Sequence, residues 1–213
     1  MMRSRFQGFL ICLTCACGIA FAEEEAGFEG RVVLEWVDET PYVAAMRLVE
    51  PFAFHQQNGK IWAVPTGSIV DGRAIPPLFA GLMGLPFEGG FRKTAVVYDY
   101  AAKAQEQPWQ DAQRMFYEGS IVEGVLPTEA KVMYMLLNAA GSRWEVRETS
   151  SCFSHCHTGE SELVWRPVVD DEPVIALASW VRQEDPSLED IEKRISDVIL
   201  HPGPHIFGYV REK

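Results

Sequence analysis

The chain has 213 residues, of which 47% are hydrophobic, and its formal net charge is −11 at pH 7. This hydrophobic content excludes a disordered chain and indicates a protein that folds around a core. The acidic balance disfavours binding to nucleic-acid phosphates or anionic lipids, because both attract basic surfaces. We therefore expect a globular protein with no nucleic-acid partner.

Residues 1–22 have the features of a secretory signal peptide. Two arginines precede an apolar run too short to span a bilayer, and small residues mark a cleavage site at Ala22. We expect a periplasmic or secreted protein, cleaved near Ala22 and without a transmembrane segment in the mature chain. A lipoprotein anchored at Cys15 or Cys17 is the alternative, although neither cysteine follows the usual Leu-small-small sequence.

The N-terminal part of the mature chain reads as antiparallel sheet. Strands are expected over 31–36, 42–54 and 60–64, where Val, Leu, Phe and Tyr are frequent. The last two flank Gln57-Asn58-Gly59, and Asn-Gly between apolar runs predicts a hairpin. Residues 66–90 are rich in glycine and proline and are expected to form a loop.

Helices are expected after this loop. Apolar residues recur at helical spacing over 91–103, 109–123 and 128–140, and the last two helices each follow a proline. Strands are then expected over 163–169 and 174–181, a final helix after Asp185-Pro186 and a short tail strand over 205–210. The predicted fold is a single α+β domain over 23–213: an antiparallel β-meander, a three-helix unit and a C-terminal strand and helix extension.

Two carboxylates are the leading candidates for chemistry. Asp99 falls on the apolar face of the helix over 91–103 and, if buried, needs a partner. It is either a general acid/base or metal ligand, or a structural carboxylate bound to a loop amide or to Arg73 or Arg114. Asp71 lies in the glycine-rich loop, where it either approaches a ligand or caps its own turn. The two residues could converge, because the loop and the helix follow one another.

Three short motifs resemble a known family. Over about 52–144, the chain is similar to the bacterial and phage family called domain of unknown function 1353. In that family a strand ends in a Val-Pro-x-Gly loop, one helix carries His-Asp-Tyr, and the next carries Ala-Asp-Arg-x-Phe. The matching residues here are Val64, Pro65, Gly67, Asp71 and Pro76; Asp99 and Tyr100; Ala112, Arg114 and Phe116; and Gly141 and Trp144. Residues 145–213 would then be an extension of the family core.

The departures from the family pattern fall on polar positions. Ala74 stands where the family has serine, Tyr98 where it has histidine, and Gln113 where it has aspartate. Tyrosine and glutamine neither titrate near pH 7 nor make good metal ligands. The resemblance therefore implies a retained scaffold with a disabled or altered site. The family has no assigned activity to carry over.

Cys152-Phe153-Ser154-His155-Cys156-His157 is a second constellation. Cys152 and Cys156 are the only cysteines left after cleavage, so a disulfide is expected in an oxidising compartment. If the thiols were reduced, both cysteines with His155 and His157 could bind a metal or act in redox chemistry. Otherwise no metal or cofactor is expected.

The sequence therefore predicts an exported, non-catalytic protein that binds an unknown envelope protein or ligand through the loop over 71–90, with Arg73, Gln113 and Arg114 as binding residues. The alternative is a cell-envelope hydrolase of the peptidoglycan type that uses Asp71 and Asp99 with Tyr98. A metal or redox protein working through 152–157 is the third class.

Overall fold

The computed structural model describes residues 25–37, 45–144, 146, 164–167, 169–200 and 209–211. The predicted signal peptide and the predicted Cys152–Cys156 disulfide, with His155 and His157, lie outside these residues. The fold is α+β, as predicted, with antiparallel sheet preceding the helices. Within the described residues, none of the helices is long and apolar enough to cross a bilayer.

The N-terminal sheet is a three-stranded meander that bends in the middle. Its two halves are the sheets β1-β4-β5 and β2-β3-β6. The strands are β1 (Gly27–Gly30), β2 (Leu34–Trp36), β3 (Met46–Leu48), β4 (Phe52–His55), β5 (Ile61–Val64) and β6 (Ile69–Val70). The pairing register does not change between the halves: Gly27 pairs with His55, and Leu34 pairs with Leu48 in the same alignment. The Val49 N–H donates to the Val33 carbonyl at 2.8 Å across the bend, so each half continues the other.

The predicted hairpin is confirmed at the turn between β4 and β5. Gly59 has φ +80°, and the Asn58 side chain accepts a hydrogen bond from the Lys60 N–H at 2.9 Å. The long strand predicted over 42–54 is instead divided between β3 and β4, with Pro51 directly before β4. A proline cannot donate to a ladder, so a break at this point is expected physically.

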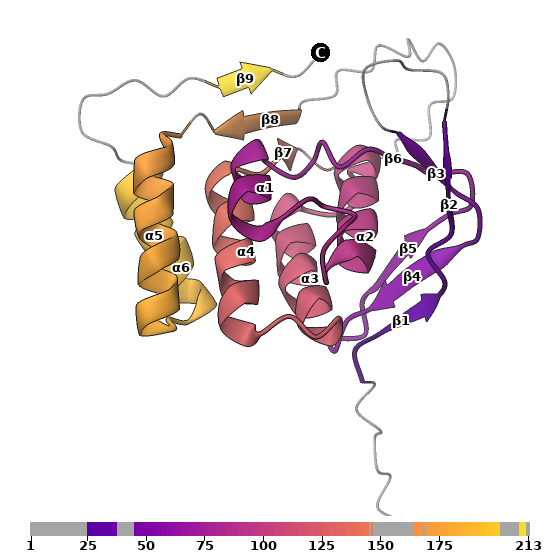
Figure 1. Ribbon diagram of the computed structural model, residues 1–213, viewed down its shortest axis with the longest axis horizontal. Helices are drawn as coiled ribbons and strands as arrows, with labels where there is room; N and C mark the ends of the chain where they lie inside the picture. The colour runs from indigo at the N-terminus through magenta and orange to yellow at the C-terminus, as the bar shows by residue number, and fades with distance from the viewer. Residues whose placement is uncertain are drawn as a thin grey trace, which may run out of the picture.

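The helices stand side by side in a row that ends at the sheet (Figure 1). The three predicted helices are present as α2 (Arg92–Ala104), α3 (Trp109–Val122) and α4 (Pro127–Ala140). Consecutive members of the row contact each other, and α2 also contacts β4, β5 and β6. The loop predicted over 66–90 contains two elements that the sequence analysis missed: β6 and the short helix α1 (Pro77–Met83), which packs on α4.

The C-terminal extension covers the far side of α4. It contains α5 (Asp171–Glu184), α6 (Leu188–Ile195), the π-helical turn η1 (Ser196–Leu200), and the strands β8 (Val164–Pro167) and β9 (Tyr209–Arg211). These two strands form a small sheet with β7 (Arg143–Trp144), which directly precedes the extension. The strand predicted over 174–181 is wrong, because this segment belongs to α5. Its buried residues recur at helical spacing, at Val174, Leu177, Ala178 and Val181.

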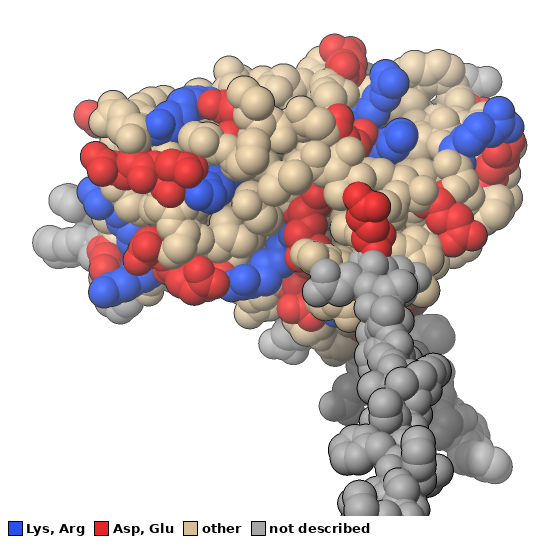
Figure 2. All heavy atoms as spheres, turned by 90° about the horizontal axis from the view of Figure 1, so that it is seen from below, with Lys and Arg blue, Asp and Glu red and all other residues tan. Residues whose placement is uncertain are grey.

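The final predicted helix is present as α6, but Asp185-Pro186 does not cap it. Asp185 has φ +45° and ends α5, whereas Ser187 caps α6 by accepting from the Asp190 N–H. On the molecular face shown in Figure 2, acidic and basic side chains are mixed rather than separated into patches of one sign.

Candidate functional site

Asp99 fastens the loop over 71–74 to helix α2. Its side chain is fully buried. The Asp71 N–H donates to Asp99 Oδ2 at 2.8 Å, and the Ala74 N–H donates to Oδ1 at 3.2 Å. Both carboxylate oxygens are therefore used to hold the backbone of the loop. This places Asp99 against loop amides, one of the two arrangements that the sequence allowed.

Lys103 completes the anchor, and the sequence analysis missed it. It lies one helical turn after Asp99, and its ammonium contacts Asp99 Oδ2 at 3.0 Å and Asp71 Oδ1 at 3.1 Å. It also donates to the Ile69 carbonyl at 3.0 Å. The three donors of the ammonium thus match three acceptors. The Asp-to-Lys spacing of four residues on a predicted helix was the available signal.

Asp71 caps its own turn. Its Oδ1 accepts from the Arg73 N–H at 3.1 Å, and the Arg73 guanidinium lies 3.7 Å from Oδ2. Gly72, between them, has φ +73°, a left-handed conformation that favours glycine. Asp71 and Asp99 therefore do converge, and the group they share is Lys103.

The other side of the loop is bound by the strands after α4. The Arg166 guanidinium donates to the Arg73 carbonyl and, at 3.1 Å, to Ser142 Oγ. Ser142 Oγ in turn donates to the Ala74 carbonyl at 3.3 Å. The loop is thus held from two directions, by α2 and by Ser142, just before β7, together with Arg166 of β8.

The same contacts close part of the outer edge of the sheet. In an antiparallel ladder, alternate residues of an edge strand turn their backbone groups away from the neighbouring strand. β5 and β6 together form the third strand of the meander. In this strand, Ile69 and Asp71 occupy such positions. Lys103 binds the Ile69 carbonyl and Asp99 binds the Asp71 N–H, so the two side chains of α2 bond groups that a fourth strand would otherwise bond.

Tyr98 and Gln113 are also brought together, but in the core. Both are fully buried, and Tyr98 packs edge-on against Phe116 with 5.4 Å between ring centres. Gln113 donates to the Leu137 carbonyl at 2.9 Å. Among the described residues, neither Tyr98 Oη nor Gln113 Oε1 completes a hydrogen bond. Burial raises the pKa of Tyr98 above its ordinary value, against a smaller opposing effect of the nearby Gln113 side chain.

Arg114 faces the C-terminal extension rather than the loop. Its guanidinium lies 2.6 Å from Glu192 and 3.8 Å from Glu189, both on α6. The Tyr134 hydroxyl of α4 donates to the same Glu192 carboxylate. Of the three predicted binding residues, only Arg73 belongs to the loop, and its side chain is 60% exposed.

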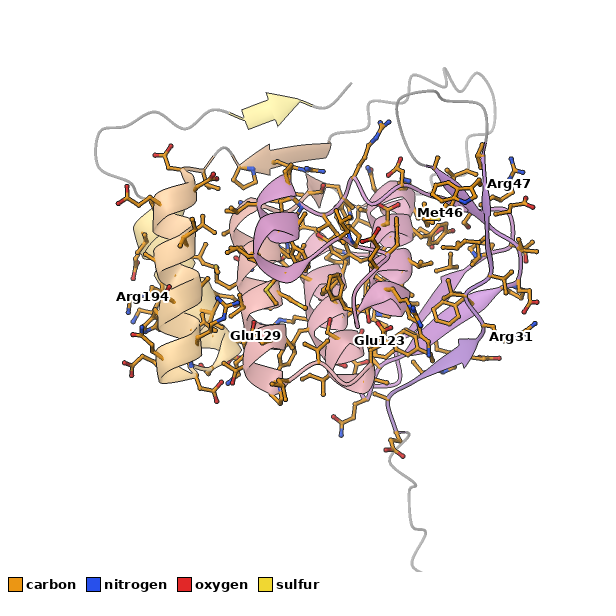
Figure 3. All side chains as sticks on the ribbon, viewed as in Figure 1. Arg31, Met46, Arg47, Glu123, Glu129 and Arg194 are labelled. Atoms are coloured by element: carbon orange, nitrogen blue, oxygen red, sulfur yellow. The ribbon has the colours of Figure 1, made fainter. Side chains whose placement is uncertain are left out.

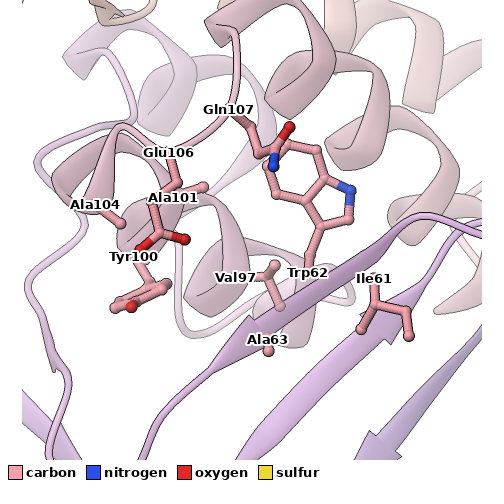
Figure 4. Close-up of a pocket in the computed structure, with 9 residues that line it drawn as sticks. All are labelled: Ile61, Trp62, Ala63, Val97, Tyr100, Ala101, Ala104, Glu106 and Gln107. Carbon is pink, nitrogen blue, oxygen red and sulfur yellow. The ribbon is translucent and has the colours of Figure 1, made fainter. Parts of the chain in front are cut away.

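Within the described parts of the chain, no three His, Cys, Asp or Glu side chains are grouped as metal ligands. A shallow pocket of about 50 Å³ lies on another side of α2, between this helix and β5. Figure 4 shows its lining, which includes Ile61, Ala63, Tyr100 and Glu106 and none of the predicted catalytic residues.

The fold and the site define an α+β domain in which a buried helix carboxylate anchors a glycine-rich loop to the edge of a bent meander. Residues 46–137 match the family described as "Protein of unknown function (DUF1353)", so the resemblance predicted from the motifs is confirmed over this segment.

Two curated relatives come from Sinorhizobium fredii (strain NBRC 101917 / NGR234). "Uncharacterized protein y4jT" is 34% identical over 140 residues, which are 63% of this chain and 41% of that protein. "Uncharacterized protein y4iH" is 30% identical over 93 residues, 44% of this chain and 39% of that protein. The chain thus spans about two fifths of the length of these relatives. No solved structure matches it.

Proposed function

We propose that this is a non-catalytic binding protein, in which Asp71 and Asp99 build a rigid loop that contacts the partner. The observation that carries this proposal is the use of both Asp99 oxygens by the Asp71 and Ala74 amides, with Lys103 beside them. A general acid or base must reach a proton on its substrate. Asp99 is fully buried, so a substrate could reach it only by breaking the bonds that hold the loop.

The neighbouring polar positions support the same proposal. Tyr98 and Gln113 stand where the related family has histidine and aspartate, and both are sealed in the core. Burial raises the pKa of Tyr98 further from neutrality, so its hydroxyl is not suited to proton transfer near pH 7. We therefore assign this pair to packing.

The binding surface in this proposal is the exposed part of the loop over 71–90. Arg73 and Leu85 project from it, and Leu85 is 51% exposed. An exposed arginine with an exposed leucine suits a partner that offers both a carboxylate and an apolar contact. The partner would be an envelope protein or ligand.

Activity on peptidoglycan tests the non-catalytic character. We expect the purified protein and its Asp71→Asn and Asp99→Asn variants to release no soluble fragments from peptidoglycan sacculi. Asp111→Asn is the matched control, since it makes the same change at a half-exposed carboxylate paired with Lys60. Release by the wild type that is kept in Asp111→Asn and lost in Asp99→Asn would establish the hydrolase alternative instead.

Export is part of the proposal, and the N-terminal sequence supports it. An arginine-rich start, an apolar run and a small-residue site at Ala22 are typical of a secretory signal. We expect periplasmic fractions to contain a chain that begins at Glu23 by mass spectrometry. A photo-crosslinker at Leu85, compared with one at Glu184 on α5, would then report whether the loop meets a partner there.

A further inference from the structure

The third strand of the meander has an outer edge that is closed at β6 and open at β5. The Gln56 N–H donates to the Lys60 carbonyl at 2.8 Å, which sets the ladder between β4 and β5. In this register Trp62 and Val64 bond to β4, whereas Ile61 and Ala63 turn their N–H and C=O groups outward. Among the described residues, nothing bonds these outward groups.

This open edge borders the shallow pocket between α2 and β5, hereafter called the groove (Figure 4). Its other wall is formed by Tyr100, Ala101 and Ala104 from the C-terminal half of α2. The two alanines leave space beside the strand, and the Tyr100 ring supplies an apolar wall. Ile61 is 57% exposed at the groove. The outward backbone groups at this edge suit one added strand, whose main chain would bond to β5.

The charge in the groove is negative. Glu106 lies in the lining, is exposed, and has no ion pair within the described part of the chain. Burial and, to a smaller extent, the negative charge of Glu106 raise the pKa of Tyr100 above its ordinary value. The two side chains are therefore close to each other. Lys60, the basic residue beside β5, already forms an ion pair with Asp111, with 2.8 Å between Nζ and Oδ2. A ligand here would therefore meet an uncompensated carboxylate.

We propose that the outer edge of β5 binds an extended, basic peptide segment of a partner protein by strand addition. The peptide main chain pairs with Ile61 and Ala63, and one of its lysine or arginine side chains contacts Glu106. The formal charge of −11 on the whole chain favours the encounter with a cationic segment. This site is distinct from the loop over 71–90 and does not depend on the function proposed for that loop.

The test uses the capped hexapeptide KVTVTK and its acidic counterpart EVTVTE, titrated into the ¹⁵N-labelled mature chain. We expect KVTVTK to shift the amide resonances of Ile61 and Ala63 and to bind more tightly than EVTVTE. Ala63→Pro should abolish binding of both peptides, because it removes the outward N–H and fills the groove while the ladder to β4 stays intact.

Glu106→Lys tests the charge without touching the strand. It should weaken KVTVTK binding about tenfold at low ionic strength. Glu184→Lys makes the same change of charge on α5 and should leave the affinity unchanged. The proposal is overturned if KVTVTK fails to bind at millimolar concentration, or if the wild type and Glu106→Lys bind it equally. It is also overturned if the chain dimerises through β5, so that a second copy occupies the edge and Ala63→Pro is monomeric.

Discussion

A buried aspartate on a helix beside a glycine-rich loop can serve chemistry or architecture, and the contacts of Asp99 give it an architectural role. Asp99 holds two amides from residues 28 and 25 positions earlier in the chain. Lys103 adds a charge on the same carboxylate. Because a buried carboxylate without partners is costly, these contacts are what allow Asp99 to remain in the core. At the residue scale, these contacts make Asp99 an anchor for the loop over 71–74.

Removing the charge of Asp99 should therefore destabilise the fold. Asp99→Asn keeps one acceptor oxygen but places an amide group where a backbone N–H points, and it leaves Lys103 with Asp71 as its remaining carboxylate partner. We expect the free energy of unfolding to fall by about 3 kcal/mol, measured by urea denaturation. Asp111→Asn, at a half-exposed carboxylate, should cost less than about 1 kcal/mol. Equal effects of the two changes would show that Asp99 is not an anchor.

Tyr98 permits the opposite prediction. Its hydroxyl is buried without a hydrogen-bond partner among the described residues, and an unsatisfied buried group is unfavourable. Tyr98→Phe should leave the unfolding free energy unchanged or raise it by about 1 kcal/mol. A loss of stability in thermal unfolding would reveal a partner for the hydroxyl.

At the scale of elements, the N-terminus of α2 is capped by a residue of a neighbouring helix. Helix α2 lacks a side-chain cap of its own, and Glu123 at the end of α3 supplies one (Figure 3). Its carboxylate accepts from the Lys93 N–H at 3.0 Å, the Thr94 N–H at 2.9 Å and the Thr94 hydroxyl at 2.7 Å. The first turn of α2 is therefore satisfied from α3, and the negative charge also suits a helix N-terminus.

Gly119 makes this close approach possible. A Cβ at Gly119 would lie 2.7 Å from Thr94 Oγ1, the atom that Glu123 holds in place. Gly119→Ala should lower the unfolding free energy by about 2 kcal/mol, through overpacking between α2 and α3. Gly81→Ala is the matched control, since a Cβ there meets nothing within 4 Å. A Gly119→Ala protein as stable as Gly81→Ala in chemical denaturation would contradict this packing.

Acid should loosen α5 from α4. A hydrogen bond from Arg182 on α5 lowers the pKa of Glu129 on α4 below its ordinary 4.5. Because the pKa is lower in the folded state, this contribution is present above the unfolded value and is lost as the pH falls through the folded value. Between about pH 5 and about pH 3, the free energy of unfolding should fall further in the wild type than in Glu129→Gln. The difference should be up to about 1 kcal/mol. Superimposable acid profiles would exclude this role.

The elements that the sequence predicted are those with local signals. The Asn58-Gly59 turn and the prolines at the starts of α3 and α4 each dictate a nearby boundary. Helix α5 was predicted as a strand because the run after Pro173 is apolar enough to suit either structure. The particular amides that Asp99 binds could not be predicted, since backbone amides carry no residue identity, whereas the spacing of four residues to Lys103 was an available signal. The closing of the sheet edge at β6 by α2 could not be predicted either, because it depends on the register of strands that are distant in sequence.

At the scale of the whole molecule, helices α5 and α6 cover one side of the segment that matches the family model. The family match ends at residue 137, within α4, and α5 and α6 pack on the far side of this helix. Arg114, which lies inside the matched segment, contacts Glu192 of α6, and Tyr134 contacts the same carboxylate. The extension therefore uses side chains of the core to dock, and the loop over 71–74 is in turn held by Arg166 of β8.

Hydrogen exchange at two amides tests the structural role of Asp99 most directly. In the wild type, the Asp71 and Ala74 amides should be protected to a degree similar to amides inside α2, because the buried Asp99 carboxylate binds them. In Asp99→Asn they should exchange at least about tenfold faster relative to amides of α4 in the same protein. Rapid exchange of both amides in the wild type, or equal protection in Asp99→Asn, would contradict the anchor.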